Sequence, residues 1–100
     1  MATKTQAGTI KILWEVGTVD FASTSAQTST DSSAITVTGA ALGDPVILGG
    51  NTTWLANAQY AAFVSAADSV VVRLSNGTSG ALDPASQTFT VGVVKLISYS

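Results

Sequence analysis

A chain of 100 residues is the size of a single domain, with room for one hydrophobic core and little room for an interior substrate cavity. Only 10% of the residues are charged, against about 25% in a typical domain, and the formal net charge is −2. The four basic residues, Lys4, Lys11, Arg73 and Lys95, are widely separated, so no basic patch can neutralise phosphates and we expect no nucleic-acid partner.

The N-terminus lacks the basic region and apolar segment of a signal peptide, and no apolar run approaches the roughly 18–20 residues of a membrane span. We therefore expect a protein made in the cytoplasm, with no membrane partner. Because so little charge is present to keep the chain dispersed, we expect much of its surface to be covered by partner proteins. The alternative is a free surface kept polar by Ser and Thr.

The first predicted strand covers residues 10–16 and follows a small, polar segment, residues 1–8, that we expect to be mobile. One face of this strand carries only large apolar side chains, those of Ile10, Ile12, Trp14 and Val16. Leu13, on the other face, indicates that this face is partly covered as well. Gly17 is predicted to end the strand, and Val19 and Phe21 to form a short second extended piece.

Residues 22–33 (ASTSAQTSTDSS) lack large apolar side chains. Such a composition cannot bury enough area to order itself, which predicts a flexible surface loop. The alternative is an edge strand or arm that orders against a neighbouring subunit, because Ser and Thr are uncharged and can pair with a backbone edge.

Residues 35–48 (ITVTGAALGDPVIL) predict a strand, a compact turn and a second strand. Ile35 and Val37 alternate with two threonines, the pattern of a half-buried strand. The two glycines of the turn tolerate positive φ, and Pro45 keeps the residues that follow it extended.

Two further strands are predicted over residues 57–65, after a loop at residues 52–56, and over residues 70–75, after a turn at residues 66–69. The alanines near the first of these also favour helix, so a single helical turn is compatible with that stretch. Residues 76–86 are dense in turn-forming residues.

The last predicted strand places Phe89, Val91 and Val93 on one face. Three apolar residues continue past the alternation, so both faces are apolar near the C-terminus: Val94, Leu96 and Ile97. About six or seven short strands separated by turns predict an all-β fold, a single antiparallel β-sandwich over residues 1–100, either jelly-roll-like or immunoglobulin-like.

Histidine and cysteine are both absent, which removes the usual general base, the usual activators of a nucleophile and the best transition-metal ligands. Three of the carboxylates, those of Asp44, Asp68 and Asp83, fall at predicted turns, where Asp favours local hydrogen bonds to the backbone. No Asp cluster matches the spacing of a calcium loop. We therefore expect no enzyme, no catalytic, metal-binding or cofactor-binding residue, no cofactor and no small-molecule substrate.

The aromatic rings of Trp14, Trp54 and Tyr60 have the shape to stack on a sugar, so a glycan-binding module is one hypothesis. In a domain this small, aromatic residues are more often core residues or anchors of an interface. Trp54, in a predicted loop near two glycines, is the best candidate for contact with a partner.

Four stretches of the chain occur in a characteristic order: Asp20-Phe21, residues 36–46 (TVTGAALGDPV), residues 62–76 (AFVSAADSVVVRLSN) and residues 82–91 (LDPASQTFTV). In this order they resemble a group of small bacteriophage virion β-sandwich proteins, which occur as trimeric capsid decoration (cement) proteins and as terminal domains of tail fibres. The resemblance covers roughly residues 20–94 and brings no catalytic residue with it. The predicted strand near the N-terminus and the apolar C-terminal end lie outside the pattern.

The resemblance implies a virion structural protein, most simply a homotrimeric decoration protein on the outer capsid surface that ties major capsid proteins together. The alternative is a tail fibre or spike tip that contacts the host surface. The candidate subunit seam consists of the two strands that are apolar on both sides, residues 10–16 and 91–97, and their alternative role is a core buried on both faces within one protomer. The candidate subunit or capsid interface consists of Ile10, Ile12, Leu13, Trp14, Trp54, Val94, Leu96 and Ile97.

Overall fold

The computed structural model describes residues 10–51, 54–55 and 57–96, and within these ranges the chain is all-β, with seven strands and no helix. The strands are β1 (Ile10–Val19), β2 (Ser29–Asp31), β3 (Ile35–Thr36), β4 (Val46–Gly49), β5 (Ala58–Ala66), β6 (Ser69–Asn76) and β7 (Gln87–Leu96). All pairings between them are antiparallel. The predicted fold class is confirmed.

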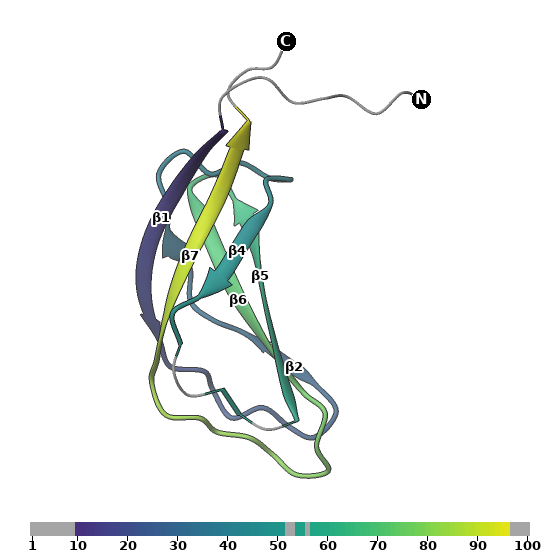
Figure 1. Cartoon of the computed structure of the whole chain (residues 1–100). Helices are drawn as coiled ribbons and strands as arrows, with labels where there is room; N and C mark the ends of the chain where they lie inside the picture. Colours follow the sequence, from purple (N-terminus) through teal and green to yellow (C-terminus); the bar gives the residue numbers. More distant parts are fainter. Residues whose placement is uncertain (1–9, 52–53, 56, 97–100) are drawn as a thin grey trace.

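The strands form two sheets, which lie one in front of the other in Figure 1. The three-stranded sheet has the order β1-β7-β4. In the four-stranded sheet, β6 pairs with the short strands β2 and β3 along one edge and with β5 along the other. This arrangement is consistent with a small β-sandwich.

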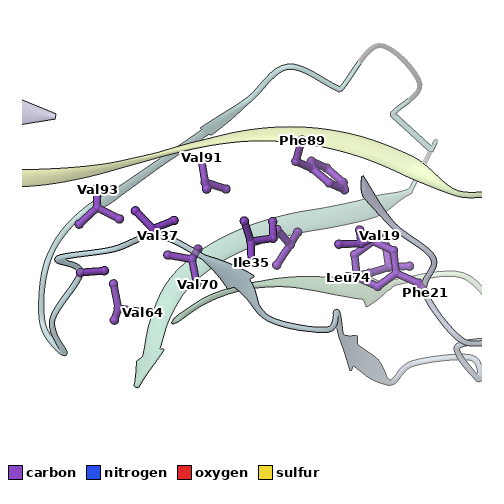
Figure 2. Packing of buried hydrophobic residues seen from close by; sticks show 12 residues of the cluster. Val19, Phe21, Ile35, Val37, Val64, Val70, Leu74, Phe89, Val91 and Val93 are labelled. Carbon is purple, nitrogen blue, oxygen red and sulfur yellow. The ribbon is translucent and has the colours of Figure 1, made fainter. Parts of the chain in front are cut away.

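The core lies between the inner faces of the two sheets. From β7, the side chains of Phe89, Val91 and Val93 are fully buried, and Figure 2 shows them pointing toward residues of the opposite layer. From β6, Val70 and Leu74 are buried to the same degree. The alternation that predicted one buried face for Phe89, Val91 and Val93 is confirmed, and β6 faces the same apolar interior.

β1 is longer than predicted, since it continues through Gly17 to Val19 in unbroken register with β7. A Cβ atom at Gly17 would lie 2.6 Å from Cγ1 of Ile35, which belongs to the other sheet. Gly17 therefore does not end the strand but lets the two sheets approach. The prediction of a separate second extended piece is wrong, because Val19 is the last residue of β1 and Phe21, although buried, belongs to no strand.

Residues 22–33 are not a free loop, because they contain β2 and are tied to β6 of the same chain. The Ser32 amide donates to the Val72 carbonyl at 2.8 Å, and the Asn76 amide donates to the Thr28 carbonyl at 2.8 Å. Small uncharged side chains allow this backbone to lie along a sheet edge. This agrees with the expected edge strand and not with the expected flexible loop. The edge belongs to the same chain rather than to a neighbouring subunit.

The predicted strands on either side of the compact turn at residues 39–45 are both present, as β3 and β4, but they belong to different sheets. The turn therefore carries the chain across the sandwich. Ile35 and Val37 are buried, whereas Thr36 and Thr38 are exposed, as the alternation predicted. Gly39 and Gly43 adopt φ values of +98° and +93°, which other residues rarely adopt.

The remaining strand predictions agree with β5, β6 and the turn between them at Ala67 and Asp68. The expectations for residues 1–8, for Ile97 and for part of the loop at residues 52–56 fall outside the described residues.

Candidate functional site

The outer face of the β1-β7-β4 sheet carries a group of large apolar side chains that the rest of the chain leaves exposed. Antiparallel register places Val94 opposite Ile12, and Gly92 opposite both Trp14 on one side and Ile47 on the other. We call this group the apolar face. It consists of Ile10, Ile12, Trp14, Val16, Ile47 and the half-buried Val94.

The side chains of the apolar face are not folded away against the sheet, because five of them are between 37% and 60% exposed. Single exposed apolar residues are ordinary on protein surfaces, but a contiguous group of this kind marks an interaction surface. The alternation of β1 is responsible for the group, since every second residue from Ile10 to Val16 is large and apolar.

Gly92 forms the floor beneath the centre of the apolar face. A Cβ atom at Gly92 would lie 2.8 Å from Cζ3 of Trp14 and 3.1 Å from Cγ2 of Ile12. The indole ring therefore lies over the backbone of β7 in space that any other residue would occupy. Trp14 is seated in one position by the glycine across from it, although half of its surface remains exposed.

No charged residue lies on the apolar face. Lys11 and Glu15 alternate onto the opposite side of β1, and Lys95 does the same on β7. Lys95 is also engaged, since its Nζ donates to Oδ2 of Asp44 at 2.6 Å. The centre of the face is thus neutral as well as apolar.

The outer face of the four-stranded sheet is built differently. The guanidinium of Arg73 lies 4.8 Å from the ring centre of Phe63 and makes two hydrogen bonds, of 2.7 and 3.1 Å, with the Asp31 carboxylate. This pairing lowers the pKa of Asp31, chiefly through the hydrogen bond from Arg73. The Arg73–Asp31 ion pair therefore covers part of this outer face, next to Phe63. No charged pair of the described residues lies over the apolar face of the other sheet.

The predicted interface residues fall into three groups. Ile10, Ile12, Trp14 and Val94 lie on the apolar face. Leu13 does not, because it points inward and packs against the core. The backbone of Leu96 pairs with Ile10, and Ile97 lies outside the described residues.

Trp54 lies away from the apolar face and covers the edge of the core. Its ring meets the rings of Tyr60 and Phe89 edge-on, with centroid distances of 5.0 and 5.9 Å. About half of Trp54 is exposed, so it combines a packing role with some free surface. Trp54 and Tyr60 therefore contact one another rather than forming an open platform for a sugar.

Two members of the apolar face are absent from the predicted interface residues, although Val16 lies in the predicted seam at residues 10–16. Val16 follows the same alternation as Ile12 and Trp14, and that signal was sufficient to include it. Ile47 could be placed there only after β4 was known to pair with β7. Leu42, the most exposed large apolar side chain among those described, lies in the turn before β4 and outside the face.

Two hollows of about 390 and 290 Å³ open on other parts of the surface. The larger is lined by amide and hydroxyl side chains and one glycine: Gln27, Thr28, Ser29, Asn57, Gln59, Ser75, Asn76 and Gly77. Among the described residues, neither lining includes an acid, a base or the pair Trp54 and Tyr60. The hollows therefore do not bring together groups for acid-base chemistry.

Within the described ranges, no three acidic side chains gather where they could hold a metal ion. No helix long and apolar enough to cross a membrane occurs in that part of the chain.

The turns that carry the resemblance have structural roles, and two of them are hydrogen-bonded to each other. The Gly39 amide donates to Oδ1 of Asp68 at 2.8 Å, and the Asp68 amide donates to the Ala40 carbonyl at 2.9 Å. Asp68 itself adopts a φ of +62°, a conformation in which Asp is more common than most residues. These bonds thus fix the start of the turn that leads from β3 to β4 against the turn between β5 and β6.

Asp44 completes the same end of the molecule. Its Oδ2 accepts hydrogen bonds from the Ala41 amide at 2.9 Å and from Lys95 Nζ at 2.6 Å. These bonds, that from Lys95 first, hold the pKa of Asp44 below its usual value. The carboxylate therefore links the turn to β7 as an anion.

Comparison with known proteins yields no matching family model, no similar curated protein and no similar solved structure.

Proposed function

We propose that this chain is a bacteriophage structural protein, a capsid decoration protein that binds the outer surface of the shell as a homotrimer. The observation that supports this most is the apolar face, which is a large neutral surface suited to contact with protein. The ordered turn motifs that resemble those of small virion β-sandwich proteins support the same function. The described residues offer shape and apolar surface rather than reactive groups.

The mechanism in this proposal is mass action. A ligand that binds the assembled shell and not its separated subunits stabilises the shell by an amount that grows with the logarithm of ligand concentration. A decoration protein needs no chemistry for this purpose. It needs a fold that is stable without bound groups and surfaces that fit neighbouring capsid subunits.

The test is binding to purified shells of the phage that encodes this chain, prepared without it. We expect saturable co-sedimentation with many copies per shell, and disruption of the decorated shell at a higher temperature than that of the bare shell. A few copies located only on the tail would instead indicate the fibre or spike function. Absence of the chain from purified particles would contradict both functions.

A further inference from the structure

We infer that the apolar face is the contact between copies of this chain, so that the outer faces of the β1-β7-β4 sheets of neighbouring protomers pack against one another. This inference rests on the proposed function and names the partner of one surface in it. A second copy is the occupant, and the shell binds elsewhere on the molecule.

The first argument is area. Five half-exposed large apolar side chains offer on the order of 400 Å² of apolar surface, which is the size of patch that is often functional. A stable interface covers about 800 Å² on each partner. Because roughly 55–65% of an interface is apolar, the apolar face supplies most of the apolar part of one subunit contact.

The second argument is charge. Two copies of a surface that carried one sign of charge would repel each other, but the apolar face holds no charged residue. Charge is depleted at the centre of subunit interfaces for this reason and because burying an unpaired charge is costly. Two copies of the apolar face can therefore pack together without charge repulsion, whereas no group on the face would orient a charged partner.

The third argument concerns the time before assembly. A chain with only 10% charged residues and a net charge of −2 has little electrostatic repulsion to keep an exposed apolar face in solution. A surface reserved for the shell would stay exposed until the shell was built. Contact between copies covers the face as soon as the protein has folded.

The fourth argument is the position of Trp14. Tryptophan is the residue type most enriched among those that dominate binding energy, near the centre of an interface. Trp14 is held over Gly92, between Ile12 on its own strand and Ile47 two strands away. A ring already fixed in place loses little conformational freedom on association, which favours binding.

The experiment measures the mass of the full chain by size-exclusion chromatography with light scattering, from nanomolar to micromolar concentration. Three single variants are compared with the wild type: Trp14→Ser, which removes the ring, Gly92→Ala, which displaces it, and Leu42→Ser. Leu42 is exposed and apolar but lies off the face, so its variant is the matched control. Circular dichroism verifies that each variant is folded. We expect this for Trp14→Ser and Leu42→Ser because both side chains are exposed, and for Gly92→Ala because the added methyl group meets the exposed side chains of Trp14 and Ile12.

We expect the wild type and Leu42→Ser to form the same oligomer, with dissociation constants within twofold of each other. Trp14→Ser should raise the dissociation constant by about thirtyfold or more. Gly92→Ala should raise the dissociation constant as well, although it adds apolar surface. The added methyl group would displace the indole ring of Trp14 from its position over Gly92. A higher dissociation constant for Gly92→Ala would distinguish a specific, shape-complementary interface from non-specific hydrophobic association.

A wild type that stays monomeric throughout the range overturns the inference, and so does an oligomer that all three variants leave intact. A monomer that binds shells and loses that binding in Trp14→Ser would show that the shell covers the face, which also overturns it. Shell binding is measured in parallel and separates the two proposals. An oligomer formed through the face that fails to bind shells supports this inference and contradicts the proposed function.

Discussion

At the scale of single residues, the buried amide of Asn76 connects two loops. Its Nδ2 donates to the carbonyls of Thr24 and Gly80, at 2.9 and 2.8 Å, and its Oδ1 accepts from the Thr78 amide at 2.9 Å. An amide supplies donors and an acceptor on one short side chain, which no apolar residue can imitate. Asn76 therefore ends β6 by joining the loops that follow β1 and β6.

Replacing Asn76 with Ala should lower the free energy of unfolding by about 2–3 kcal/mol, because the Thr78 amide loses its acceptor and the carbonyls of Thr24 and Gly80 each lose one donor. Urea denaturation followed by tryptophan fluorescence measures this change. Gln59→Ala is the control, since Gln59 is exposed, and we expect a change within about 0.5 kcal/mol. Equal effects of the two substitutions would contradict the role assigned to Asn76.

The carboxylate of Asp44 makes stability depend on acid pH. Hydrogen bonds from Lys95 and the Ala41 amide lower the folded-state pKa of Asp44 below the unfolded value of about 4. The unfolded state therefore takes up a proton first as the pH falls. The stabilisation by Asp44 is fully present above about pH 4 and is lost as the pH falls through the lowered pKa.

Asp44→Asn should be less stable than the wild type at pH 7, and the difference should shrink as the pH is lowered toward 2. Thermal melts at a series of pH values measure this convergence. Asp83→Asn is the matched control, because Asp83 is an exposed aspartate at another turn, and it should follow the wild type. A gap between Asp44→Asn and the wild type that stays constant with pH would contradict the assignment.

At the scale of elements, β1 shows how one strand serves two surfaces. Its inward residues, Leu13 and Val19, pack toward the core, while its outward residues form most of the apolar face. Gly17 lies directly against Ile35 of the opposite sheet. The inner side of β1 is therefore packed against the opposite sheet, whereas its outer side is exposed.

Gly17→Ala should destabilise the fold by about 1–3 kcal/mol, because the new methyl group would overlap the buried side chain of Ile35. Gly49→Ala is the matched control, since Gly49 also lies in a strand of this sheet and a Cβ there meets nothing within 4 Å. Chemical denaturation of both variants measures the change in the free energy of unfolding that each substitution causes. If Gly17→Ala proves as stable as Gly49→Ala, the sheets are not in close contact at Gly17.

At the scale of the whole molecule, association should raise the apparent stability of the fold. When folded copies bind each other and unfolded chains do not, the melting temperature depends on protein concentration. For a domain of this size we expect a rise of about 5 °C or more over a hundredfold increase in concentration. Differential scanning calorimetry or fluorescence melts measure the rise.

The same concentration series on Trp14→Ser should show a flat melting temperature, because that variant should be monomeric over most of the range. Leu42→Ser should retain the dependence of the wild type. Equal dependence in all three proteins would mean that the stabilising contact lies elsewhere on the surface.

The strands that face the core were predictable from the sequence because their pattern is local. Phe89, Val91 and Val93 alternate with small or polar residues, and this spacing alone predicts a strand with one buried face. Residues 22–33 were harder to assign, because small polar side chains give no periodic signal. The order of that stretch comes from backbone hydrogen bonds to β6, which lies some 40 residues further along the chain.

The sequence by itself determined the all-β class, the strand faces and the lack of histidine and cysteine chemistry, since each depends only on residue types and their spacing. The tertiary structure alone decided that β3 and β4 belong to different sheets, and that Ile47 joins Trp14 across Gly92. The physical reason is that strand neighbours are selected by long-range pairing. An alternating pattern specifies which side of a strand is apolar, but not which strand lies beside it.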